Sequence, residues 1–276
     1  MAVKITTLIE NSTGEHHGLK AEHGLAFFIE TEECRILFDT GQSGAFIENA
    51  HYLCKDLTTL DYVVLSHGHY DHSGGLIPLL DVARQFKLVL GQGFFDEKYG
   101  YRDGSYEYLG NSFDELFLNK HLISYQFLDQ PLYELKPGIF LLTDFSRRHA
   151  DEVINPRFKV LRDGVFSPDP FTDELLLALD SPKGLIVILG CSHPGMKNML
   201  DSVVARLRRP IYAVLGGTHL IEADRNSLDI SVNYLNRNVG GALGVSHCSG
   251  QIAISRLAES SECFFQNSTG RSLIVA

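Results

Sequence analysis

The sequence predicts an α/β protein in which helices cover two β-sheets, built as a single domain over residues 1–276. Short apolar runs rich in Val, Ile and Phe follow one another in the first third of the chain, as in a β-meander. In the second half, similar runs alternate with segments that have apolar residues at helical spacing, which favours sheets covered by helices. A chain of 276 residues with 44% hydrophobic residues can bury a substantial core.

The first elements are expected to be strands joined by short connections. The run 61–66, DYVVLS, is expected to be a short buried strand, and Ser73 after it has the chemistry of a helix N-cap. A helix is therefore expected over residues 74–86, where apolar residues recur at helical spacing. The other strands expected in this part span residues 3–9, 24–30, 34–40 and 87–91.

Residues 92–119 differ in composition from the elements on either side. They are rich in Tyr, Phe, Gly and acidic residues, so we expect an aromatic-rich insertion or lid here. Its part from Phe94 to Tyr108 could stack on a flat substrate, or could pack as a lid or as a contact in a homo-oligomer. Beyond it, strands are expected at 138–145, 173–180, 184–190, 211–217 and 241–247, and helices at 196–207, 227–238 and 251–260.

Charge and composition exclude several classes of partner. The formal net charge is −10, whereas binding a nucleic-acid backbone needs a basic surface, so no nucleic-acid partner is expected. No apolar run is long enough to cross a bilayer, and the N-terminus lacks the pattern of a secretory signal, so no membrane association is expected. The five cysteines are scattered and never spaced as C-x-x-C, which favours a reduced cytoplasmic protein. The expected partner is a small-molecule substrate.

Five of the expected strands end in a side chain that could bind a metal or carry a proton. Ligand sites in α/β sheets lie at the carboxyl ends of strands, so we expect these side chains to form one site. They are Asp39; His67, His69, Asp71 and His72; Cys191 and His193; His219; and His247 and Cys248.

The segment 61–76, DYVVLSHGHYDHSGGL, carries the strongest of these signals. His67 and His69 are two residues apart, so both can point the same way from an extended loop. Asp71 and His72 follow, where a turn could aim them at a second ion. A single catalytic zinc takes three protein ligands, and this chain offers more, so we expect two ions. The donor types favour zinc, with manganese or iron as alternatives.

Other candidates are given supporting roles or none. Asp39 in LFDTG could accept a hydrogen bond that orients a ligand histidine, or could be a turn residue before Gly41. Cys191 is expected to support the site as a small buried residue beside the ligands, and Cys248 is expected to be buried in the same way. No role is assigned to His16, His17, His23, His51, His121 and His149.

The motif SHGHYDHSGGL resembles the signature of the metallo-β-lactamase superfamily. FDTGQS, GCSHPG, GGTHL and HCSG are similar to motifs of one branch, the metal-dependent hydrolases like 7,8-dihydropterin-6-methyl-4-(β-D-ribofuranosyl)aminobenzene 5′-phosphate synthase, and the resemblance spans residues 37–250. It implies a four-layer αββα sandwich of two mixed sheets flanked by helices, with a dinuclear metal site at one edge. It also implies that His67 and His69 bind one ion, that Asp71 and His72 serve the second, and that His247 is a late histidine ligand.

The chain departs from the common pattern of the superfamily at one point. Many members have an upstream histidine and a bridging aspartate in a Gly-Asp step, where this chain has GCSH, so the bridging carboxylate is missing. We expect His193 of this loop to complete the ligand set of the first ion. His219 could be a ligand or a hydrogen-bond donor to the transition state, and we place it with Asp71 in the catalytic group. A weak second metal site is expected.

The leading functional hypothesis is a metal-dependent hydrolase acting on a phosphorylated or pterin-like small molecule. Its ions would give a hydroxide that attacks phosphorus or a carbonyl carbon, while Asp71 or a histidine moves a proton. Arg147 and Arg148 could meet a substrate phosphate or could lie in a solvated loop. The branch also allows a synthase of pterin biosynthesis. An iron-bearing redox or sensing protein is a further alternative, although that use of the fold normally needs a flavin partner domain.

Overall fold

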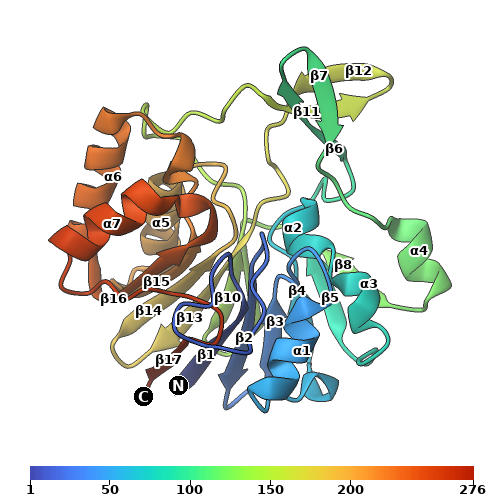
Figure 1. Ribbon diagram of the computed structural model, residues 1–276, viewed down its shortest axis with the longest axis horizontal. Coiled ribbons are helices and arrows are strands. Elements are labelled where there is room, and N and C mark those ends of the chain that lie inside the picture. Colours follow the sequence, from blue (N-terminus) through green and yellow to red (C-terminus); the bar gives the residue numbers. More distant parts are fainter.

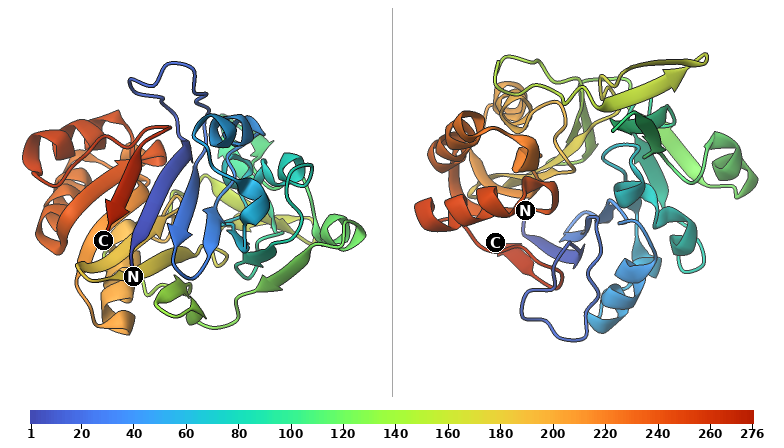
Figure 2. Two further views of the ribbon diagram at one scale, coloured as in Figure 1. Left: turned by 90° about the horizontal axis from the view of Figure 1, so that it is seen from below. Right: turned by 45° about the horizontal axis from the view of Figure 1, so that its top comes forward.

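Two large β-sheets lie face to face in the computed structural model, which describes residues 1–276 (Figure 1). One sheet has seven strands in the order β17-β1-β2-β3-β4-β5-β8, and the other has six in the order β16-β15-β14-β13-β10-β9. Helices cover the outer face of each sheet, so the layers follow one another as α, β, β and α (Figures 1 and 2). The predicted four-layer αββα sandwich is confirmed.

Both sheets are mixed, and their parallel strands lead to the site. The first sheet contains β1 (Val3–Ile9), β2 (Ala26–Thr31), β3 (Arg35–Phe38), β4 (Tyr62–Val64), β5 (Lys87–Leu90), β8 (Ser124–Phe127) and β17 (Ser272–Val275). The second contains β9 (Leu132–Lys136), β10 (Ile139–Leu142), β13 (Leu176–Ser181), β14 (Gly184–Leu189), β15 (Ile211–Gly217) and β16 (Val239–Ser246). β3, β4 and β5 run parallel, as do β14, β15 and β16. The loops after these strands therefore leave each sheet on one side.

Apolar side chains on both faces of each sheet account for the layers. In β2, Phe27 faces the core between the sheets, whereas Phe28 packs under the helices of the first sheet. In β14, Ile186 faces the same central core, whereas Val187 packs under the helices of the second sheet. Side chains alternate along a strand, so a strand covered on both faces must be apolar throughout. This is why these strands appear in the sequence as continuous apolar runs.

Helices of different length cover the two sheets. α1 (Ala45–Tyr52) and the single turns α2 (Tyr70–Ser73) and α3 (Leu76–Leu79) lie on the first sheet. α5 (Met196–Leu207), α6 (Arg225–Asn238) and α7 (Gln251–Ser260) lie on the second. None of the helices is long and apolar enough to cross a bilayer. β17 pairs with β1, so the two ends of the chain lie side by side (Figure 1).

A third, smaller sheet projects from the sandwich (Figures 1 and 2). Its strand order is β12-β11-β6-β7, with β6 (Glu97–Arg102), β7 (Ser105–Tyr108), β11 (Phe158–Arg162) and β12 (Val165–Pro168). Residues 92–119 supply β6, β7 and the following α4 (Glu115–Lys120). The rings of Tyr106 and Phe166 stack with centroids 3.7 Å apart, so aromatic side chains of this sheet pack on one another.

Most predicted elements are present, and residues 74–86 are the clearest exception. α5, α7 and β15 have the predicted bounds. The helix predicted over residues 74–86 is wrong, because Ser73 ends α2 instead of capping a helix, and only the turn α3 follows. A Cβ on Gly75 would lie 2.2 Å from the carbonyl oxygen of Thr40. Close packing of this loop on residues 40–43 thus overrides the helical spacing of its apolar residues. α1 and β17 are also present and have no counterpart among the elements expected from the sequence.

Candidate metal centre

The loops that follow the parallel strands bring the predicted polar side chains together. The HxHxDH motif follows β4, and further histidines follow β14, β15 and β16. All these side chains are buried except that of His219, which is partly exposed. Except for His69, whose Nδ1 lies 3.0 Å from His67 Nε2, their ligand atoms fall into three groups that also contain two thiols. The members of each group lie within 4.8 Å of one another: Asp71, His72, Cys191 and His247; His67, Cys191 and His193; and Cys191, His219 and Cys248.

A close-packed loop presents His67 and His69. Gly68 between them has no room for a side chain, because a Cβ there would lie 2.2 Å from the carbonyl oxygen of Phe94. The N–H of Gly68 donates to Asp173 Oδ2 at 2.7 Å. Held in this way, His67 Nε2 and His69 Nδ1 lie 3.0 Å apart. Two ligands of one tetrahedral ion have a similar separation.

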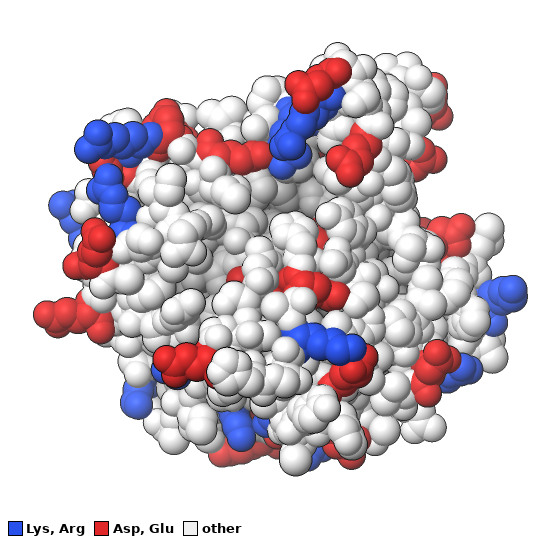
Figure 3. Space-filling model, viewed as in Figure 1, with Lys and Arg blue, Asp and Glu red and all other residues white.

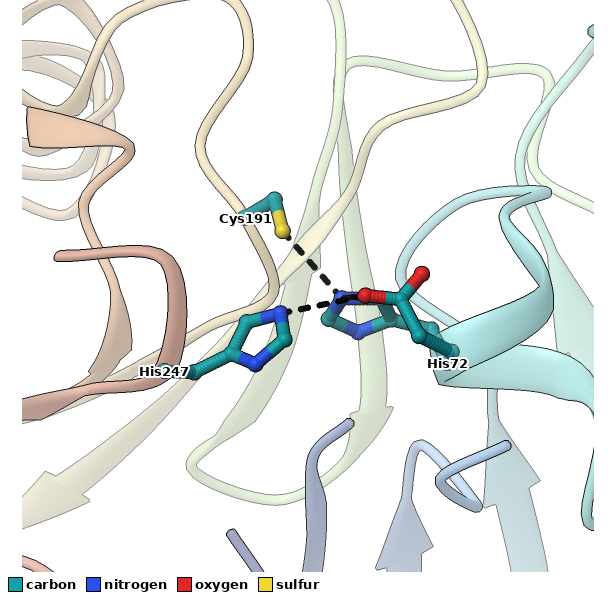
Figure 4. A group of neighbouring side chains, drawn as sticks. His72, Cys191 and His247 are labelled. Atoms are coloured by element: carbon teal, nitrogen blue, oxygen red, sulfur yellow. Dashed lines mark hydrogen bonds and ion pairs between the residues drawn. The ribbon is translucent and has the colours of Figure 1, made fainter. Parts of the chain in front are cut away.

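A second group surrounds Asp71. Its Oδ2 lies 3.7 Å from His72 Nε2, and 3.2 Å from His247 Nε2 without the angles of a good hydrogen bond. Cys191 Sγ lies 3.2 Å from His72 Nε2. Figure 4 shows Cys191, His72 and His247 reaching one point from separate loops. Because Asp71 and His72 share the single turn α2, two adjacent residues can serve the same group.

Contacts on the far side of the imidazoles fix their orientation. His72 Nδ1 lies 2.6 Å from Asp39 Oδ2, and His247 Nδ1 lies 2.9 Å from Asn11 Oδ1. With Nδ1 occupied in each ring, Nε2 is the nitrogen that faces the group. A carboxylate or amide oxygen behind a histidine is the usual means of orienting a metal ligand.

The donor atoms of the site fit a metal ion. His193 Nε2 and His247 Nε2 are buried and make no hydrogen bond, which is costly for a polar atom unless it binds something else. Burial lowers the pKa of His67, His69 and His193 well below the usual value. These imidazoles are therefore neutral, and the neutral form is the one that binds metals.

The charged residues of the second group shift one another's pKa values. Burial would lower the pKa of His72, but the carboxylates of Asp39 and Asp71 raise it to about 9. Burial would raise the pKa of Asp71, but His72, His23 and His247 hold it well below its usual value. Without a metal, the site would thus carry a carboxylate beside a protonated imidazole, and a cation that binds there replaces the proton.

His219 lies at the rim of the site. Its backbone has a φ of 51°, and its ring centroid lies 4.4 Å from that of His193. Its Nε2 lies 3.2 Å from Glu222 Oε2, whereas its Nδ1 is buried without a hydrogen bond. Burial would lower the pKa of His219, but contacts with Cys248 and Glu222 raise it to about 10. This imidazole can therefore donate a hydrogen bond at neutral pH.

Some residues of the site are not among the predicted ones. His23 Nε2 lies 3.2 Å from Asp71 Oδ2. Behind the first ligand loop, the buried amine of Lys98 lies 2.8 Å from Asp169 Oδ2 and 3.0 Å from Asp173 Oδ1. These contacts join segments that are far apart in the sequence, so no local spacing signals them.

Other candidates lie away from the ligands. Arg147 donates to the carbonyl oxygen of Pro170 and lines a different cavity. Neither Arg147 nor Arg148 lines the cavity at the candidate metal ligands, and a phosphate contact of these arginines stays a prediction. His149 Nε2 pairs with Asp201 Oδ2 at 2.8 Å, outside all three groups.

A cavity of about 470 Å³ opens onto the ligand groups. Figure 3 shows a hollow on this face of the molecule, with both basic and acidic side chains above it. Two arginines from the third sheet and its approach, Arg102 and Arg157, line the cavity. Arg157 Nε lies 2.7 Å from Glu222 Oε1, and its guanidinium lies 4.0 Å from the ring centroid of Phe158. The cavity is therefore lined by metal-competent side chains, by Arg102 and by the Arg157–Glu222 ion pair.

Sequence comparisons identify relatives over most of the chain. Residues 19–88 match the family model described as the metallo-beta-lactamase superfamily. The 7,8-dihydropterin-6-methyl-4-(beta-D-ribofuranosyl)-aminobenzene-5′-phosphate synthase of Methanocaldococcus jannaschii is 30% identical over 262 residues, which are 90% of this chain and 88% of that protein. An uncharacterized protein of the same archaeon is 29% identical and covers 92% of this chain and 94% of its own length.

Solved structures show the same architecture. The crystal structure of Tm1679, described as a metal-dependent hydrolase of the beta-lactamase superfamily, has a TM-score of 0.86 at 29% identity, with 99% of each chain covered. YhfI from Bacillus subtilis, described as a metallo-beta-lactamase fold protein, has a TM-score of 0.55 at 12% identity, covering 99% of this chain and all of its own, and supports the fold alone. This chain belongs to the metallo-β-lactamase superfamily, as shown by the sequence identity over nine-tenths of its length, the matching family model and the shared architecture.

Proposed function

We propose that this chain is a metal-dependent hydrolase that acts on a small phosphorylated molecule. The observation that carries the proposal is the convergence of buried imidazole, carboxylate and thiol groups on one cavity, with imidazole nitrogens that no protein atom satisfies. The likeness to Tm1679, described as a metal-dependent hydrolase, supports it.

Two sets of residues would hold the ions. Each set combines residues from the HxHxDH motif with a histidine from a later strand end. His67, His69 and His193 would hold one ion, and Asp71, His72 and His247 would hold the other. Bound ions would lower the pKa of a coordinated water toward neutrality and polarise a substrate oxygen.

Two phenylalanine rings pack against the ring of His193. Phe171 stacks on the His193 ring with centroids 3.9 Å apart, and Phe158 packs against the same ring at 4.9 Å. Both phenylalanines are buried. A low-dielectric wall of this kind strengthens every charge interaction with a bound substrate.

The arginines at the rim favour an anionic substrate. Arg102 and Arg157 line the cavity, whereas the chain as a whole has a net charge of −10. Arg157 is held in place by Glu222 and Phe158, which limits its motion before a substrate arrives. A guanidinium presents a planar fork of donors that matches a phosphate group.

His219 is placed to assist the departing group. Its Nε2 is held by Glu222, and its unpartnered Nδ1 remains available for a substrate oxygen. His219 also lines the cavity. Donation of this proton would stabilise negative charge on a leaving alkoxide. Asp71, which belongs to a different donor group, is the second candidate for proton transfer.

The synthase of the pterin pathway is a second candidate function. The 30% identity to the Methanocaldococcus jannaschii synthase favours it. Tyr70, Leu109 and Phe158 line the cavity and offer flat apolar surface to a pterin ring. A synthase and a phosphohydrolase would share the phosphate contact at Arg102 and would differ in whether water is a reactant.

The test is a turnover assay on protein purified without chelators and reconstituted with zinc. The panel contains phosphomonoesters, phosphodiesters, lactones, thioesters and phosphorylated pterins. Hydrolysis of a phosphate ester that is lost in His69→Ala supports the hydrolase. Failure on the whole panel by metal-loaded protein refutes it, and consumption of a phosphorylated pterin only with a second organic substrate favours the synthase.

A matched pair of variants tests the substrate class. Arg102→Ala should raise KM for the phosphorylated substrate by about tenfold to a hundredfold, because a hydrogen bond to a charged group is worth ~1.5–3 kcal/mol. Arg162→Ala is the control, since Arg162 lies on the same small sheet but pairs with Asp96 outside the cavity. Equal effects of the two variants would contradict a phosphate contact at Arg102.

A further inference from the structure

We propose that the thiolate of Cys191 is a metal ligand shared by both ion positions, in place of the missing bridging carboxylate. This inference rests on the metal centre of the proposed function. It differs from the expectation that Cys191 is only a small buried residue beside the ligands.

The position of Cys191 carries the inference. Its Sγ belongs to the group with Asp71, His72 and His247, and also to the group with His67 and His193. No other side chain belongs to both groups. A ligand within reach of both sets of donors can bind two ions at once.

The surroundings of the sulfur are those of a ligand. A buried free cysteine normally behaves as a small hydrophobic residue among apolar neighbours. Cys191 Sγ instead lies 3.2 Å from His72 Nε2, at the point where separate loops converge (Figure 4). Among the other donors of these two groups, Asp71 would be the lone anion facing two divalent ions, because the imidazoles are neutral ligands. A thiolate adds the second negative charge that a bridging carboxylate would supply.

The loop holds Cys191 in a fixed place. A Cβ on the preceding Gly190 would lie 2.2 Å from Ser66 Oγ, so this loop packs directly on the HxHxDH loop. After it, the buried carboxylate of Glu174 accepts hydrogen bonds from the N–H groups of Ser192 at 2.6 Å and His193 at 3.1 Å. The sulfur therefore reaches the two groups from a backbone anchored on both sides.

A thiolate ligand has a chemical consequence for metal choice. When an ion binds, the thiol proton passes to solvent and a metal–sulfur bond forms. Thiolate is a soft ligand that favours zinc, iron or cobalt over magnesium and manganese. The Cys191 variant should therefore lose discrimination among these ions as well as affinity.

Cobalt substitution of the whole 276-residue chain tests the assignment. A thiolate bound to Co²⁺ absorbs in the near ultraviolet, and the band should grow across both equivalents of added cobalt. Cys191→Ser should abolish the band and lower the metal content from about two ions to about one. Cys34→Ser is the matched control, because Cys34 is a buried free cysteine that belongs to none of the three donor groups, and it should keep the band.

Several results would overturn the inference. A band that persists in Cys191→Ser would assign the sulfur to another cysteine, such as Cys248 in the third group, and a band lost in Cys34→Ser would assign it outside the site. A band complete after one equivalent of cobalt would exclude a shared ligand. X-ray absorption of zinc-loaded unmutated protein needs no variant to fold, and it should show a sulfur neighbour at about 2.3 Å. Nitrogen and oxygen neighbours alone would refute the assignment.

The outcome is separable from that of the proposed function. Protein that binds two ions through Cys191 but cleaves none of the substrate panel would refute the hydrolase and leave the ligand assignment intact. Protein that hydrolyses a substrate but shows no metal–sulfur bond would do the reverse.

Discussion

Replacing Lys98 with methionine should destabilise the protein strongly, although Lys98 touches no predicted metal ligand. Its amine lies 2.8 Å from Asp169 Oδ2 and 3.0 Å from Asp173 Oδ1. All three side chains are at most 3% exposed. Methionine keeps most of the volume of lysine but leaves two buried carboxylates without a counter-charge.

The expected magnitude follows from burial. Removing one partner of a buried ion pair costs ~3–5 kcal/mol, and at ~2–4 °C per kcal/mol the midpoint of thermal unfolding should fall by roughly 6–20 °C. The assay is thermal unfolding followed by circular dichroism, with chelator in every sample so that metal binding does not contribute. Metal content is a second readout, because Asp173 also holds the Gly68 N–H between two ligands.

Arg162→Met is the control for Lys98→Met. Arg162 is on the same small sheet, and its pair with Asp96 is largely exposed, so its loss should cost about 0–1 kcal/mol. If the two variants unfolded at similar temperatures, the idea that buried charge pairing anchors the third sheet to the ligand loop would be wrong.

Two further predictions concern single residues behind the ligands. Asp39→Asn should weaken metal binding about tenfold to a hundredfold while the fold is kept, because Asp39 orients His72 through a 2.6 Å contact. An unchanged dissociation constant for the metal in a competition titration would contradict this. Gly68→Ala should lower both the unfolding temperature and the metal content, because the added Cβ would lie 2.2 Å from the carbonyl oxygen of Phe94. Gly240→Ala is the control and should change neither, because its added Cβ would have its nearest neighbour at 3.8 Å.

Local patterns predicted which side chains come together, because each of them lies in a short segment with a clear pattern. His67 to His72 lie in one motif after one strand, and His193, His219 and His247 each follow an apolar run that could only be a buried strand. The carboxyl ends of parallel strands lie at the same edge of a sheet, so the order of the elements was enough to predict that these side chains share one site.

Local patterns failed where distant segments decide the structure. The helix expected after Ser73 does not form, because Gly75 must pack against the backbone of Thr40. The third sheet pairs β6 with β11, which lie far apart in the chain, so no local sequence pattern indicates that they pair.

The functional contacts missed from the sequence have the same origin. His23 reaches Asp71, and Lys98 reaches Asp173, across long stretches of chain. Cys191 could be located after a strand, but only the folded loops show that its sulfur lies between two groups of donors.

Elemental analysis of protein purified without chelators tests the central claim most directly. Wild-type protein should contain about two ions per chain, and His69→Ala and His193→Ala should both contain fewer. His149→Ala is the control, since His149 pairs with Asp201 away from the ligands, and it should match the wild type. Wild-type protein that carries no metal and takes up none on reconstitution would contradict a metal centre at this site.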